Sequence, residues 1–72
     1  MITDEKIQKI IEDIKLKANN NSERQVYISI REYDITANSE NEEYVLNQLF
    51  EKGIISKGET VGKGLLSCIV SK

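Results

Sequence analysis

The stretch that decides the fold runs from Ser39 to Ile55 and reads SENEEYVLNQLFEKGII. Its first four residues fit a capping box, in which the Ser39 oxygen accepts the amide of Glu42 and the Glu42 side chain reaches back to the Ser39 amide. An apolar stripe at helical spacing follows, consisting of Tyr44, Val45, Leu46, Leu49 and Phe50. Gly53, followed by an isoleucine, is typical of a left-handed C-terminal cap. The pattern therefore predicts one amphipathic helix from Ser39 to Gly53.

The chain before this helix predicts another helix and a strand. Thr3 can cap a helix whose first turn is acidic, which suits the helix dipole. The polar run Asn19-Asn20-Asn21-Ser22 predicts where that helix stops. Residues Gln25 to Ile30 then alternate between β-branched and polar or aromatic side chains, which predicts a strand with one buried side. One face of the predicted first helix is aliphatic and consists of Ile7, Ile10, Ile11 and Ile14.

The segment from Arg31 to Ala37 is open to two interpretations. Tyr33 and Ile35 would lie on the wrong face if the preceding strand simply continued. One interpretation is a bulged or longer strand. The other is a short helix in which Ile30, Tyr33 and Ala37 share a face, and the spacing slightly favours it.

The chain after the Ser39–Gly53 helix predicts a hairpin. Ile54-Ile55 can begin a strand, and Leu65 to Val70 is rich in apolar and β-branched residues. Three glycines lie between them in a polar setting and predict a loop at the tip: Gly58, Gly62 and Gly64. The chain has no proline, low-complexity tract or internal repeat, so we expect one domain over residues 1–72.

The composition argues against several kinds of site. The chain has no histidine and one cysteine, Cys68, so it lacks the usual ligands of a structural zinc site and cannot form an internal disulfide. We interpret Cys68 as a small core residue. Gly58 to Gly64 is one residue too short for a phosphate-binding loop and lacks the hydroxyl after its lysine. Without a histidine base or an accessible thiol, we expect no enzymatic activity and no cofactor.

Hydropathy and charge limit the expected cellular location of the protein and the classes of partner it can bind. No apolar run approaches the length of a membrane span, and Met1-Ile2-Thr3-Asp4 does not begin a secretory signal, so we expect a cytoplasmic protein with no membrane partner. The net charge is −2 and the pI is about 5.1. This balance gives no general attraction to phosphate backbones. Any contact with nucleic acid would depend on a local basic patch.

The run from Leu46 to Ile55, followed by a glycine-containing hairpin, resembles the third helix and wing of a winged helix-turn-helix domain. In that family a helix ending in a leucine, a lysine-glycine pair and two aliphatic residues leads into a two-stranded wing. A short strand after the first helix joins the wing sheet, and Val26 to Ile30 would be that strand. The resemblance implies an α+β, winged-helix-like fold in the order helix, short strand, short helix or bulge, helix, wing. The alternative is another small α+β domain with a three-stranded antiparallel sheet.

The resemblance also implies a small DNA-binding regulatory protein. The third helix of that family usually enters the major groove. Here the predicted helix has four glutamates and one basic residue, Lys52, a net charge of one minus four, or −3. The glutamates are Glu40, Glu42, Glu43 and Glu51. A helix with that balance is repelled by phosphate unless its glutamates point away from the duplex. The residues that would contact DNA come from the helix start, the wing and an upstream arginine: Arg31, Asn38, Asn41, Asn47, Lys57 and Lys63.

The second functional hypothesis is a protein-interaction module. An acidic helix suits a basic partner, such as a nucleic-acid-binding protein, and its contacts would include Glu40 and Glu43. Tyr27 lies on the strand face opposite the aliphatic residues, where an exposed tyrosine can anchor an interface. The isoleucine face of the first helix leads to a further hypothesis, a homodimer through that face.

Overall fold

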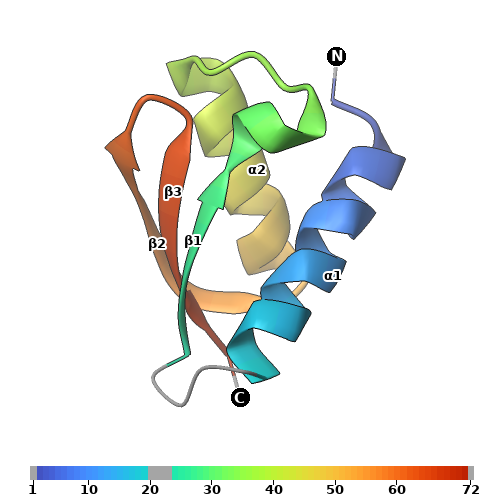
Figure 1. Ribbon diagram of the computed structural model, residues 1–72, viewed down its shortest axis with the longest axis vertical. Helices are drawn as coiled ribbons and strands as arrows, with labels where there is room; N and C mark the ends of the chain where they lie inside the picture. Colours follow the sequence, from blue (N-terminus) through green and yellow to red (C-terminus); the bar gives the residue numbers. More distant parts are fainter. Residues whose placement is uncertain (1, 20–23, 72) are drawn as a thin grey trace.

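The first helix is α1 (Asp4–Asn19), labelled in Figure 1, and it includes the predicted isoleucine face. The computed structural model describes residues 2–19 and 24–71, so most of the predicted stop, residues 20–22, lies outside the described residues. Thr3 caps α1 as predicted, because its Oγ1 accepts a hydrogen bond from the Lys6 amide at 3.3 Å. All four isoleucines of the face are buried within the domain. The domain itself covers this face, so the isoleucines no longer support a homodimer through the first helix, which stays a prediction.

The strand β1 (Gln25–Ser29) passes directly into η1 (Ile30–Tyr33), a single turn of 3₁₀ helix. The short-helix interpretation is confirmed, although the helix ends before Ala37. Asp34 closes the turn with a φ of 62°, and its amide donates to the carbonyl of Arg31 at 3.1 Å. The change from strand to helix resets the side-chain alternation, so that both Ile30 and Ile35 are buried.

The helix α2 (Ser39–Glu51) is the predicted amphipathic helix with a different N-terminal cap. Asn38 is the N-cap, and its side chain accepts a hydrogen bond from the Asn41 amide at 2.8 Å. The predicted capping box is wrong, because asparagine one residue earlier is an equally good cap and takes the position. The Glu42 side chain is buried and hydrogen-bonds elsewhere, so it is not the partner of the Ser39 amide.

The C-terminal end of α2 is closed as predicted. Gly53 has a φ of 70°, in the left-handed region that glycine adopts without strain. Its amide donates to the Phe50 carbonyl at 3.0 Å, and the Ile54 amide donates to the Leu49 carbonyl at 2.9 Å. These two bonds form a Schellman motif, which satisfies carbonyls that the helix leaves free.

The hairpin consists of β2 (Ile55–Gly62) and β3 (Leu65–Val70). The predicted loop was too long, because β2 continues through Gly58 and only Lys63 and Gly64 lie between the strands. Gly58 pairs with Cys68, and a Cβ on it would lie 2.7 Å from Cδ2 of Leu46 in α2. A glycine at this position therefore lets the helix approach the strand closely.

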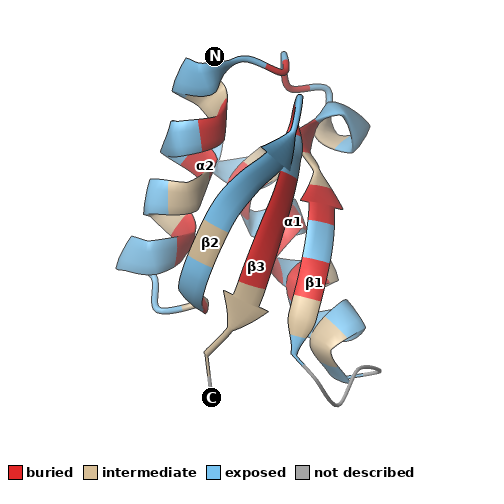
Figure 2. Ribbon diagram, turned by 90° about the vertical axis from the view of Figure 1, so that its left-hand side faces the viewer, coloured by how far each residue is buried: buried red, intermediate tan, exposed pale blue. Residues whose placement is uncertain are grey.

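The three described strands form one antiparallel sheet in the order β1-β3-β2. Both helices lie on one face of it, and the other face is uncovered (Figures 1 and 2). The described part of the chain is thus a small α+β domain of two α-helices and a three-stranded sheet, with its core between the layers. The core side chains are Ile7, Ile10, Ile11, Ile14, Val26, Ile28, Ile30, Ile35, Val45, Leu49, Ile55, Leu66 and Cys68.

Candidate functional surfaces

The hairpin tip is fastened to the start of α2 by a buried carboxylate. The Gly64 amide donates to Oε2 of Glu42 at 2.7 Å, and Glu42 is only 7% exposed. The Gly64 carbonyl accepts the Ile30 amide at 2.9 Å. Gly64 has a φ of 78°, and a Cβ on it would lie 2.7 Å from the Cβ of Ala37. One glycine therefore joins the hairpin, η1 and α2, and no larger residue fits.

This junction brings two of the predicted DNA-contacting cations together. Arg31 of η1 and Lys63 of the hairpin tip line one surface hollow of about 420 Å³ with Asp34 and Thr36. Both cations are exposed, and neither side chain forms a hydrogen bond or ion pair with another residue of the described part. Lys63 also lines an adjoining hollow that includes Asn38.

The asparagines at the start of α2 have structural partners. Asn38 caps the helix, and Nδ2 of Asn41 donates to the Thr36 carbonyl at 2.8 Å. The side chain of Asn41 is therefore committed to the segment that enters α2. Asn47 lies further along α2 and is exposed. Of these three asparagines, only Asn38 lines a hollow together with Lys63.

Lys57, one of the predicted DNA contacts, lies within β2 and away from the hairpin tip. It lies near the start of β2, where it pairs with Ile69, while Lys63 follows the last residue of the strand. Residues of β2 rise about 3.3 Å each, which separates the two lysines by most of the length of the strand. The six predicted DNA-contacting residues therefore do not form one surface.

The exposed face of α2 is acidic. Glu40, Glu43, Asn47 and Glu51 are exposed, and helical spacing puts them on one side. Glu42 faces inward, so the surface charge of the helix with Lys52 is one minus three, or −2, and not the −3 counted from the sequence. Two aromatic side chains flank this face, Tyr44 at 40% and Phe50 at 42% exposure. The arrangement combines negative charge with accessible aromatic surface.

The uncovered face of the sheet carries Tyr27, which is exposed as predicted. Nε2 of Gln25 donates to the Tyr27 hydroxyl at 3.2 Å and to Oγ of Ser67 at 3.3 Å. Leu65 and the pair Lys57 and Glu59 belong to the same face by their alternation along the strands. The face is therefore mainly polar around one tyrosine.

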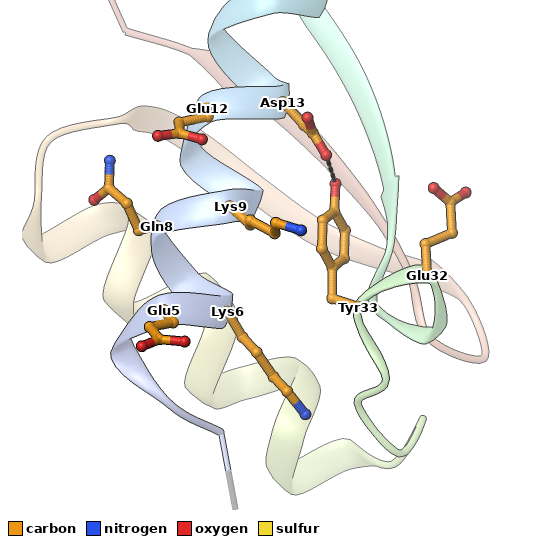
Figure 3. A pocket seen from close by; sticks show the side chains of 8 residues that line it. All are labelled: Glu5, Lys6, Gln8, Lys9, Glu12, Asp13, Glu32 and Tyr33. Atoms are coloured by element: carbon orange, nitrogen blue, oxygen red, sulfur yellow. Dashed lines mark hydrogen bonds between the residues drawn. The ribbon is translucent and has the colours of Figure 1, made fainter.

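A polar groove of about 740 Å³ lies between α1 and η1 (Figure 3). Across it the Tyr33 hydroxyl donates to Oδ2 of Asp13. Burial, this hydrogen bond and the charges of Asp13 and Glu32 raise the pKa of Tyr33 well above its ordinary value. Nζ of Lys6 donates to the Asp34 carbonyl at 3.0 Å. These bonds tie η1 to the first helix, and the mixed charges of the groove favour no one class of ligand.

Among the described residues, the one cysteine is buried. Burial raises the pKa of the Cys68 thiol to about 11, which keeps it protonated and unreactive at neutral pH. In residues 2–19 and 24–71, no group of three or more histidine, cysteine or acidic side chains is placed to hold a metal ion. None of the helices that these residues form is long and apolar enough to cross a membrane.

The bond between Glu42 and Gly64 is the feature that sequence reasoning missed. Its residues are 22 positions apart, and the match of Ser39 and Glu42 to a capping box gave the glutamate another role. The available signal was Asn38, an alternative cap that would free Glu42 for a different partner.

Comparison of the chain with models of protein families, with curated proteins and with solved structures gives no match. The surfaces of the described residues are therefore the basis for inferring what the domain binds.

Proposed function

We propose that this domain is a protein-interaction module whose helix α2 binds a basic surface of a partner protein. The observation that carries the proposal is the exposed face of α2, where three glutamates lie beside two half-exposed aromatic residues. Positive and negative surfaces attract each other over distance and fix the orientation of a complex. Aromatic side chains supply the apolar contact that charge alone lacks.

The inward position of Glu42 supports this reading of the helix. The Glu42 side chain hydrogen-bonds within the fold. The other acidic side chains of the helix form no hydrogen bond or ion pair in the described part: Glu40, Glu43 and Glu51. The same charges oppose insertion of α2 into a DNA groove. A basic protein surface, such as that of a nucleic-acid-binding protein, is the partner that fits them.

Titration of isotope-labelled protein with a short arginine-rich peptide tests the proposal by NMR. We expect the largest amide shifts at Glu40, Glu43 and their neighbours along α2. The double variant Glu40→Gln/Glu43→Gln should bind about fivefold more weakly, since exposed ion pairs contribute about 0.5 kcal/mol each. The matched control is Glu5→Gln/Glu12→Gln, which removes two exposed charges from α1. Equal weakening by both pairs would show that only net charge matters and would refute a specific surface.

DNA-binding regulation of winged-helix type is the second candidate. It is supported by the element order and by the antiparallel pairing of β1 with β3, the arrangement that the resemblance implies for the strand after the first helix. The meeting of Arg31 and Lys63 at one end of the domain also favours it. In this candidate the duplex is contacted from that end, because the exposed face of α2 is acidic.

A DNA-cellulose column at low salt separates the two candidates. Retention that falls with salt supports DNA binding, since phosphate contacts release counterions. Passage without retention, together with peptide binding to α2, supports the protein-interaction module.

A further inference from the structure

The hollow between η1 and the hairpin tip combines two unpaired cations with a fixed backbone. We propose that it is a binding site for a phosphate group, held by Arg31 and Lys63 with the Thr36 hydroxyl available as a further donor. Guanidinium and ammonium groups are the side chains that proteins use most for phosphate. The hollow lies apart from the exposed face of α2, so this inference does not rest on the proposed protein interaction.

The backbone beside each cation is held in place. The residue before Arg31 donates its amide to the Gly64 carbonyl at 2.9 Å, so η1 is tied directly to the residue after Lys63. The Gly64 amide is in turn bound by the buried carboxylate of Glu42 at 2.7 Å. A phosphate would therefore meet two cations whose Cα positions are already set, and its binding would cost less ordering.

Two acidic residues bear on the charge of the hollow. The carboxylate of Glu42 accepts the Gly64 amide at the hairpin tip. The opposing charge is Asp34, whose exposed side chain lines the hollow and lowers its net positive charge. This residue gives the proposal its sharpest test, because removing its charge should strengthen binding of an anion while removing either cation should weaken it.

The test is an NMR titration of isotope-labelled protein with pyrophosphate at low ionic strength, where exposed charges are least screened. We expect the amides of Arg31, Lys63 and Gly64 to shift most in the unaltered protein. Arg31→Gln and Lys63→Gln should each weaken binding roughly tenfold, as expected for loss of one charged hydrogen bond. Asp34→Asn should tighten binding, and asparagine tolerates the left-handed backbone at this position. Lys57→Gln is the matched control and should leave the affinity unchanged.

A parallel titration with a short DNA duplex identifies the source of the phosphate. Shifts at the same amides with pyrophosphate alone would assign the hollow to a small phosphorylated ligand. Shifts with both probes, lost together in Arg31→Gln, would assign it to the phosphates of nucleic acid. The proposal is overturned if pyrophosphate shifts no amide of the hollow, or if Lys57→Gln weakens binding as much as Lys63→Gln.

Discussion

At the scale of single residues, Glu42 matches a helix-capping residue in the sequence but forms a tertiary hydrogen bond in the structure. As a capping residue it would have been exposed at the start of α2, but it is buried and accepts the Gly64 amide. A buried amide without an acceptor costs about 1 to 3 kcal/mol, so the fold depends on this oxygen.

Glu42→Ala should therefore destabilise the domain by about 1 to 3 kcal/mol, because it leaves the Gly64 amide without a partner. Glu42→Gln should cost less, since the amide oxygen of glutamine can still accept the hydrogen bond. Urea unfolding measures both changes. Glu43→Ala is the control, because its side chain is exposed and its loss should change stability by less than about 0.5 kcal/mol. Equal effects at the two positions would contradict the role of Glu42.

Tyr33 leads to a prediction about pH. Its folded pKa is raised above the ordinary 10.0, first by burial and then by the hydrogen bond to Asp13. The folded state therefore keeps the phenol proton after the unfolded state has lost it. Stability from this group is complete below pH 10.0 and declines as the pH rises toward the folded value. Tyr33→Phe should remove this decline and the latest phase of tyrosinate absorbance, whereas Tyr27→Phe should retain both.

At the scale of elements, the sequence predicted correctly those features that depend on residues close together in the chain. The isoleucine face of α1, the alternation in β1 and the glycine that ends α2 each act within a few residues, and all three predictions are confirmed. The errors arose where a contact distant in sequence decides the outcome. Gly58 reads as a loop residue but belongs to β2, where it makes room for Leu46.

The candidate site was predicted less well for the same reason. Arg31 and Lys63 are 32 positions apart, and they are brought together by the pairing of β1 with β3 and the adjoining hydrogen bond from Ile30 to Gly64. Lys57 and Lys63 are close in sequence, yet the extended strand between them puts them far apart. Sequence spacing identifies residue types for a site but not the tertiary contacts that assemble it.

Gly64→Ala should disrupt the junction of hairpin, η1 and α2. The φ of 78° is unfavourable for alanine, and its Cβ would lie 2.7 Å from the Cβ of Ala37. We expect a loss of about 1 to 3 kcal/mol in thermal or urea unfolding. Adding Ala37→Gly should remove the collision and recover part of that loss. Gly62→Ala serves as the control, because its Cβ would meet only Leu65 at 3.6 Å, an ordinary contact.

At the scale of the whole molecule, the sheet is open on one face, and the outer edge of β1 carries a positive charge. Nζ of Lys17 donates to the Tyr27 carbonyl at 3.4 Å, which places a cation over that edge. The helix α2 packs on the covered face of β2, beside Gly58. The cation disfavours addition of a further strand next to β1, so contacts with partners on that side are expected through side chains.

A domain of this size has a stability of only about 4 to 11 kcal/mol, so one core should hold the described elements as a single cooperative unit. Cys68 reports on this unit, because its thiol is fully buried in the central strand and its pKa is raised to about 11. Ile10→Ala in α1 should cost about 2 to 5 kcal/mol. It should therefore increase the rate at which a thiol reagent labels Cys68 by at least about tenfold.

The control for this prediction lies on the same helix. Leu16 is 61% exposed, so Leu16→Ala should change stability by less than about 0.5 kcal/mol and leave the labelling rate nearly unchanged. If Ile10→Ala lowered the helical signal without faster labelling of Cys68, the sheet would be stable without α1. That outcome would contradict a single cooperative core, since the isoleucines of α1 and the inner face of β3 belong to the same buried cluster. Parallel changes in helical signal and labelling rate would establish that the layer of helices holds the sheet together.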